Sequence, residues 1–256
     1  MPFDLDINIL LILILFGFLA AFIDSVVGGG GLISLPALMF VGLPPSAAVA
    51  TNKLAGTMGS LTSTVTFYRS GKLDIKAVYK LFPLRLFGLY AGCLDCPPNG
   101  SKCTKAINAD YACSRCHLYH LQKRLGGSMT TYKQLTPKRS IIFVFVITLI
   151  GFYDGFLGPG TGSFLLFAFL IVGFDFLQAA GNAKFLNFGS NVAALLMFIY
   201  LGQINYAYGL PMGLAQIAGA IVGSKFAIKR GSGYVRKLFI VVTILLLLKN
   251  TYDYFS

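Results

Sequence analysis

The chain has 256 residues, and 56% of them are hydrophobic while only 12% are charged. A mean hydropathy of +0.73 excludes a soluble globular protein. The net charge of +12 arises mostly from short clusters of Lys and Arg between apolar segments, which is typical of membrane topology. The sequence has no basic, aromatic-interleaved domain that would indicate nucleic-acid binding. We therefore expect an integral membrane protein.

The apolar segments predict an all-α, polytopic bundle of transmembrane helices. No Lys or Arg precedes the first segment, so we expect it to be retained as a membrane helix rather than cleaved as a signal peptide. The segments 32–43 and 162–173 have about twelve residues each. As helices they would span about 18 Å of a roughly 30 Å hydrocarbon core, so we interpret them as broken or re-entrant half-helices. In chain order the segments are 9–27, 32–43, 46–67, 76–92, 140–157, 162–173, 177–200, 205–227 and 235–254.

The centre of the sequence is the stretch from residue 24 to residue 53. It is apolar enough for a membrane, yet it contains four consecutive glycines, three prolines and the polar residues Asp24, Asn52 and Lys53. Irregular backbone and ionisable side chains at membrane depth are costly unless they line a cavity or a pathway. The stretch therefore predicts a transport site.

The same pattern returns about 130 residues later, which predicts two repeats. Interrupted segments at corresponding places in two halves of a membrane protein indicate where the substrate binds. In an alignment without gaps, the first-half residues Phe22, Asp24, Gly28, Gly30, Leu35, Ala50, Asn52, Gly59 and Ser60 fall on Phe152, Asp154, Gly158, Gly160, Leu165, Ala180, Asn182, Gly189 and Ser190.

Three motifs stand out in these stretches. They are F-I-D-S-V-V-G-G-G-G-L-I-S-L-P-A-L, A-T-N-K-L-A-G-T-M-G-S-L and G-F-Y-D-G-F-L-G-P-G-T-G-S. At these motifs, and over about residues 9–84 and 135–254, the sequence resembles the sulfite exporter TauE/SafE family of bacterial membrane transporters. The resemblance implies a secondary transporter, a permease or exporter, that moves a small anion such as sulfite or an organosulfonate across the bacterial inner membrane.

Enzyme chemistry is not indicated. The sequence has no Walker lysine motif. Both of its histidines lie in an anomalous polar segment, residues 85–131, so no Ser/His/Asp set is plausible. We expect no cofactor and no metal, and the expected partners are the small anion and the lipid bilayer. A passive channel is an alternative, and dependence of flux on the proton gradient would argue against it.

The basic clusters indicate how the two halves are oriented. They include Arg69 and Lys72, then Lys138 and Arg139, then Lys229 with its neighbours. All lie on the cytoplasmic side if the N-terminus is outside, the short segments cross the membrane and one further crossing lies between residues 92 and 133. The glycine motifs then lie on opposite sides, so we expect inverted repeats. If the short segments do not cross, the last cluster conflicts with the other two.

The candidate substrate-binding residues are of three kinds. Glycines allow backbone N–H groups or half-helix N-termini to face an anion, with close helix packing as the alternative. Asn side chains, with Thr and Ser as weaker candidates, donate either to an anion or across helix interfaces. A Lys inside an apolar segment is either a charge partner of the substrate or reaches to the membrane interface. The candidates are Gly28, Gly29, Gly30, Gly31, Thr51, Asn52, Lys53, Gly158, Gly160, Gly162, Asn182, Lys184, Asn187 and Ser190, with Asn191 nearby.

Asp24 and Asp154 immediately precede the glycine motifs at matching positions. A buried carboxylate there could couple proton movement to anion flux. The alternatives are a cap on the next short helix, or an ion pair with Lys53 or Lys184. We favour the structural role.

Residues 85–131 break the membrane pattern, because they form a polar stretch where the topology requires a helix. Two C-x-x-C pairs have the spacing of a zinc ribbon. The second pair and the His that follows it match a c-type haem attachment site. Taken at face value, these motifs would make the chain a membrane-anchored metal or haem redox module. The residues concerned are Cys93, Cys96, Cys103, Cys113, Cys116, His117 and His120.

A shifted reading frame explains this segment better. A Cys codon read one base later encodes Val or Ala, and Asp, Tyr and His codons become codons for Ile, Thr or Met. In that frame residues 85–126 finish one membrane helix and supply the missing next one. We hypothesise that residues from about 85 to 126 are out of frame between two compensating shifts. The predicted organisation is a first membrane repeat at 1–84, the anomalous segment at 85–131 and a second membrane repeat at 132–256.

Overall fold

The computed structural model of the chain describes residues 7–94, 137–156, 158, 160–238 and 240–241. All regular structure within these residues is helical, so the expected all-α fold is confirmed. By length and composition, three of the described helices could each cross a membrane: α1, α9 and α10. In chain order the helices are α1 (Ile7–Val27), α2 (Gly31–Phe40), α3 (Pro45–Arg69), α4 (Ile75–Val78), α5 (Leu81–Leu94), α7 (Pro137–Phe156), α8 (Thr161–Val172), α9 (Phe176–Tyr200) and α10 (Tyr206–Arg230).

The helices follow the apolar segments closely, with one difference. The segment expected at 76–92 is divided into α4 and α5. Pro83 lies in the first turn of α5, and because proline has no N–H it cannot donate to the carbonyl of Tyr79. The helix therefore restarts after Tyr79. Of the segment expected at 235–254, the structure describes a helical stretch at 232–238 and only residues 240 and 241 beyond it.

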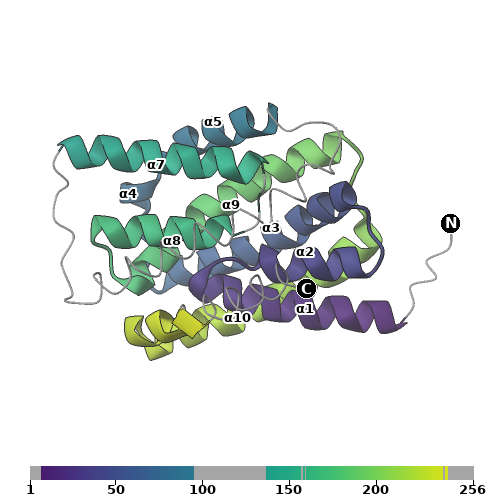
Figure 1. The fold of residues 1–256 in the computed structure, drawn as a ribbon. Helices are drawn as coiled ribbons and strands as arrows, with labels where there is room; N and C mark the ends of the chain where they lie inside the picture. The colour runs from purple at the N-terminus through teal and green to yellow at the C-terminus, as the bar shows by residue number, and fades with distance from the viewer. Residues whose placement is uncertain (1–6, 95–136, 157, 159, 239, 242–256) are drawn as a thin grey trace, which may run out of the picture.

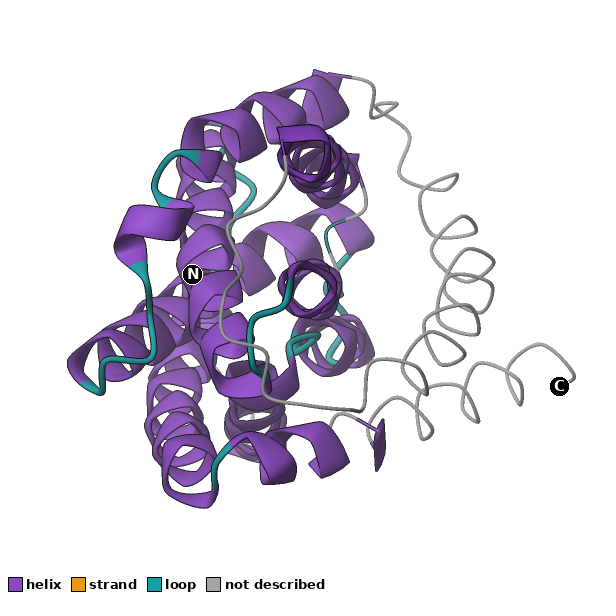
Figure 2. Ribbon diagram, turned by 90° about the vertical axis from the view of Figure 1, so that its left-hand side faces the viewer, coloured by secondary structure: helices purple, strands orange, loops and turns teal. Residues whose placement is uncertain are grey.

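The two long helices α3 and α9 contact each other near the centre of the bundle (Figure 1). On one side of them α1 packs along α10, and on the other side α5 packs along α7. Short loops join most of these helices (Figure 2). Each helix that leads into a glycine motif, α1 or α7, thus packs against a helix of the other half of the chain.

Two glycines permit these close pairs. A Cβ on Gly219 of α10 would collide with the carbonyl oxygen of Phe18, and a Cβ on Gly88 of α5 would collide with the carbonyl oxygen of Thr148. Phe18 and Thr148 are both the twelfth residue of their helices, α1 and α7. The two helix pairs therefore use the same contact at equivalent positions.

The larger apolar core surrounds the short helix α8. Leu165, Leu166 and Phe169 of α8 are almost completely buried, together with Phe67 of α3 and Ile147 of α7. Apolar residues cover almost every face of α8, and most of its side chains are enclosed by protein. A helix of only 12 residues that is surrounded by other helices cannot be a simple lipid-facing span.

Candidate functional site

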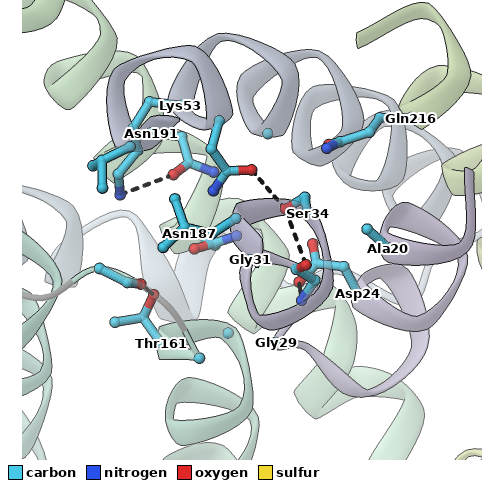
Figure 3. Close-up of a pocket in the computed structure, with 18 residues that line it drawn as sticks. Ala20, Asp24, Gly29, Gly31, Ser34, Lys53, Thr161, Asn187, Asn191 and Gln216 are labelled. Carbon is cyan, nitrogen blue, oxygen red and sulfur yellow. Dashed lines mark hydrogen bonds between the residues drawn. The ribbon is translucent and has the colours of Figure 1, made fainter. Parts of the chain in front are cut away.

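A cavity of about 50 Å³ lies where the two glycine motifs meet (Figure 3). A water needs roughly 10–15 Å³, so the cavity has room for about three to five waters or one small ion. Its walls come from α1, α2, α3, α9 and α10, from the first turn of α8 and from both glycine turns. The lining residues are Ala20, Asp24, Gly29, Gly30, Gly31, Ser34, Leu35, Val49, Asn52, Lys53, Gly56, Gly158, Gly160, Thr161, Gly162, Asn187, Asn191 and Gln216.

The glycine turns need a backbone conformation that other residues rarely adopt. Gly28 and Gly158 occupy equivalent places and have φ values of 77° and 80°. Gly28 also packs directly on α8, because a Cβ there would collide with the backbone of Gly162 and Ser163. The first glycine turn therefore touches the first turn of α8, and the first turns of α2 and α8 reach the same cavity. Helix first turns carry N–H groups without intrahelical partners, which favours an anion.

Asp154, the eighteenth residue of α7, is buried and contacts two cations. Its Oδ1 accepts from Lys53 Nζ at 3.0 Å and from Thr161 Oγ1 at 3.2 Å. Its Oδ2 accepts from Arg85 Nη2 at 2.9 Å. Arg85 Nη2 also donates to Ser190 Oγ at 3.0 Å. We call Asp154, Lys53, Arg85, Thr161 and Ser190 the Asp154 cluster.

Asp24, the eighteenth residue of α1, contacts one cation. Its Oδ2 accepts from Lys184 Nζ at 2.6 Å, and its Oδ1 accepts from the Gly30 N–H at 3.0 Å. The Asp24 side chain is 21% exposed, whereas the Asp154 side chain is fully buried. We call Asp24, Lys184 and Gly30 the Asp24 cluster.

The two lysines are structurally equivalent, although they differ by one place in the ungapped alignment. Lys53 is the ninth residue of α3 and Lys184 the ninth of α9. The one-residue offset arises because α8 has two residues more than α2, 12 against 10, while the loop before α9 is one residue shorter than the loop before α3. Each lysine pairs with the aspartate of the other half, so the ion pairs cross between the halves.

Together the two clusters contain three cations (Lys53, Arg85 and Lys184) and two carboxylates. Asp24 is partly exposed and the other four are buried, and among the side chains whose burial is described no other Lys, Arg, Asp or Glu is buried. The charges of the two clusters therefore sum to one surplus positive charge. Lys53 lines the cavity, so this surplus lies beside it. An uncompensated buried charge is costly, and an anion in the cavity would neutralise it.

Amide side chains complete the cavity wall. Asn52 Oδ1 accepts from Ser34 Oγ at 2.6 Å, so Asn52 can offer only its amide NH2 to a ligand. Asn191 Oδ1 accepts from Lys53 Nζ at 3.3 Å. Asn187 and Gln216 also line the cavity. These groups present hydrogen-bond donors to an anion.

The structure places most of the predicted site residues in the cavity wall and gives the others partners behind it. Thr51 Oγ1 accepts from the Asn205 N–H, and Asn182 Oδ1 accepts from the Asp74 N–H, both at 3.0 Å. Ser190 lies behind the wall with Arg85. Those in the wall are Gly29, Gly30, Gly31, Asn52, Lys53, Gly158, Gly160, Gly162, Asn187 and Asp24, and those outside it are Gly28, Thr51, Asn182, Lys184, Ser190 and Asp154.

Sequence reasoning did not select four polar residues that the structure brings to the site: Ser34, Thr161, Gln216 and Arg85. Gln216 had a usable signal, because it is a polar residue inside an apolar helix. Arg85 was assigned to the anomalous segment. The fourth helical segments begin at Ile75 and Tyr206, and Arg85 and Gln216 stand at the same distance beyond these residues. This equivalence favours placing the start of any frame shift after Arg85.

The other motifs of the anomalous segment cannot be placed. Cys96, Cys103, Cys113, Cys116, His117 and His120 lie outside the described residues, and for Cys93 only the backbone is described. Within the part of the chain that the structure describes, no group of His, Cys, Asp and Glu could hold a metal.

Comparisons with known proteins identify the family of the chain. Residues 13–250 match the model of the sulfite exporter TauE/SafE family. A probable membrane transporter protein of Sinorhizobium is 38% identical over 98% of this chain and 95% of its own length. Probable membrane transporter proteins of Haemophilus influenzae and Escherichia coli K12 are 32% and 33% identical, over 98% and 92% of this chain and 97% and 87% of their own lengths. No solved structure matches the chain. The chain therefore belongs to the sulfite exporter TauE/SafE family of multi-pass membrane transporters.

Proposed function

We propose that this protein is a secondary transporter of a small oxyanion in the bacterial inner membrane, and that sulfite is its substrate. The observation that carries the proposal is the surplus positive charge of the buried clusters, which lies beside the cavity at Lys53. A desolvated cation next to a cavity attracts an anion strongly because the local dielectric constant is low.

The size of the cavity supports an inorganic oxyanion over an organosulfonate. Drug-sized ligands occupy pockets of roughly 300–1,000 Å³, far larger than this one. A volume of about 50 Å³ suits an ion with one central atom and a few oxygens. The amides of Asn52, Asn187 and Gln216 can donate to these oxygens.

The crossed contacts support two repeats related by a pseudo-two-fold axis. Lys53 pairs with Asp154 while Lys184 pairs with Asp24, and Thr51 accepts from Asn205. Asn182, at the equivalent place in α9, accepts from Asp74. Reciprocal contacts of this kind are a property of two-fold symmetry. With the basic clusters on the cytoplasmic side, the axis lies in the membrane plane and the repeats are inverted, as in transporters that alternate access to a central site.

Flux in proteoliposomes tests the proposal. We expect the purified full-length protein to catalyse saturable sulfite flux that unlabelled sulfite on the opposite side accelerates, because a carrier exchanges its substrate and a channel does not. Lys53→Gln should lower this flux at least about tenfold, since the ammonium beside the cavity is lost.

Arg69→Gln is the matched control, because it removes one positive charge from the exposed end of α3 and should leave flux unchanged. Absence of saturable flux of any small oxyanion, or equal flux in the Lys53→Gln and wild-type proteins, would contradict the proposal.

A further inference from the structure

We propose that Arg85 is a positioning residue of the anion site, which keeps Asp154 paired while Lys53 turns to the bound anion. The inference rests on the proposed function, because it concerns how the same site receives its substrate. When the anion binds, Lys53 moves from the Asp154 carboxylate to the anion, and Arg85 remains paired with Asp154.

Asp154 uses its two carboxylate oxygens for different cations. Oδ1 accepts from Lys53 Nζ, and Oδ2 accepts from Arg85 Nη2. Since the two cations use different oxygens, Lys53 can move away without breaking the Arg85 contact. Thr161 Oγ1 remains beside Oδ1, with its one hydroxyl hydrogen directed either to Oδ1 or to the Gly158 carbonyl oxygen.

Lys53 lies between the Asp154 carboxylate and the cavity. An ammonium has three donors, and the contacts to Asp154 and Asn191 use two of them. Lys53 lines the cavity, and the Gly158 turn runs beside its ammonium, where a Cβ would lie 3.7 Å from Nζ. An anion in the cavity therefore competes with Asp154 for the same ammonium.

Arg85 is held away from the cavity in an unfavourable environment. Its side chain is 1% exposed and does not line the cavity, while Ser190 fixes the same nitrogen that contacts Asp154. Its Nε and Nη1 are buried without a hydrogen-bond partner, which is unfavourable. Lys53 alone would suffice to neutralise Asp154, so a second cation is unnecessary unless Lys53 leaves.

The Asp24 cluster differs from the Asp154 cluster in its cations. Asp24 has one cation, Lys184, and that lysine does not line the cavity. Gln216 stands at the place equivalent to Arg85 and carries no charge. The second cation therefore occurs only on the carboxylate whose lysine faces the substrate.

Calorimetric titration of the purified full-length protein with sulfite tests this inference. Arg85→Gln should weaken sulfite binding at least about tenfold, because Asp154 then depends on Lys53 and retains it. Asp154→Asn should bind sulfite at least as tightly as the wild type, because nothing competes for Lys53. The double variant Arg85→Gln/Asp154→Asn should return to within about threefold of the wild type, since the residues act through one another.

Two further variants separate positioning from net charge and from folding. Ser190→Ala changes no charge but removes the second anchor of Arg85, and it should weaken binding about threefold. Arg85→Lys keeps a cation and should bind nearly as well as the wild type. If Arg85→Gln does not elute as a folded protein, the double variant and Ser190→Ala decide the question.

Several results would overturn the inference. They are unchanged affinity in both Arg85→Gln and Ser190→Ala, weaker binding in both Arg85→Gln and Asp154→Asn, or a double variant that binds no better than Arg85→Gln. A wild type that binds neither sulfite nor another small oxyanion would instead overturn the proposed function, and this inference with it.

Discussion

The Asp24 and Asp154 clusters are the same arrangement built twice with different results. In both, the eighteenth residue of a helix pairs with the ninth residue of a helix from the other half. Asp24 is partly exposed to the cavity and its lysine lies behind it, whereas Asp154 is enclosed and its lysine faces the cavity. The two copies thus place the same residue types at equivalent positions, but in one copy the aspartate lines the cavity and in the other copy the lysine does.

Resequencing the gene across codons 80–135 has the largest consequence for this comparison. We expect two compensating frame shifts that replace the cysteine-rich stretch with apolar membrane helices and leave Arg85 in place. The physical reason is that Arg85 makes specific buried contacts with Asp154 and Ser190, whereas the cysteines and histidines stand where a bilayer span is needed.

Two other outcomes would change the argument. If codon 85 does not encode Arg, the Asp154 cluster loses its second cation and the two clusters become alike in charge. If the frame stands throughout, the metal and haem content of the purified protein becomes the next measurement.

Substitution of the two equivalent glycines should affect the halves unequally. Gly28→Ala places a methyl group against the backbone of Gly162 and Ser163, so we expect about 3 kcal/mol or more of destabilisation and little folded protein. Gly158→Ala has a similar positive φ but a Cβ no closer than 3.5 Å to its neighbours, so only backbone strain of about 1–2 kcal/mol is expected.

Fluorescence-detected size-exclusion and thermal unfolding of both variants would measure this difference. Gly42→Ala is the control, because its φ is 91° and nothing lies within 4 Å of the added Cβ. Equal losses of folded protein in all three variants would show that the stability of the first half is limited by backbone conformation and not by the contact between the glycine turn and α8.

Asp24→Asn should lower stability and leave the pH dependence of flux unchanged. In the wild-type protein the Asp24 carboxylate already accepts from Lys184 and from the Gly30 N–H, which is the structural role favoured from sequence. We expect a loss of about 1–3 kcal/mol, because Lys184 would remain buried without its counter-charge. Initial sulfite flux measured at several pH values would test the second part. Flux that no longer responds to pH in Asp24→Asn would assign proton coupling to Asp24 instead.

Much of the fold could be predicted because hydrophobicity and the residues that begin or end helices are local properties of the sequence. The apolar segments located the helices, and the gap between the segments 32–43 and 46–67 contains the Pro44 and Pro45 pair, where α3 begins. The break between α4 and α5 was missed because Pro83 is tolerated in a helix first turn and was treated as part of one continuous segment.

Within the candidate site, the sequence indicated residue types and an ion pair of the aspartates with Lys53 or Lys184 as one alternative, but not which lysine pairs with which aspartate. Lys53 and Lys184 were both recognised as costly cations, yet only their contacts show that one faces the cavity and the other lies behind Asp24. Asn182 and Asn187 differ in the same way, since Asn182 binds the Asp74 backbone and Asn187 lines the cavity.

The sequence by itself determined that this is a membrane transporter with a repeated, glycine-interrupted motif, because burial in a bilayer demands long apolar helices and penalises every polar exception. The tertiary structure decided which of these polar residues contact one another. Crossed pairing of Lys53 with Asp154 and of Lys184 with Asp24 depends on how α3 and α9 pack between the halves, over sequence separations of 101 and 160 residues. Contacts at that range follow from helix packing, and no local pattern contains them.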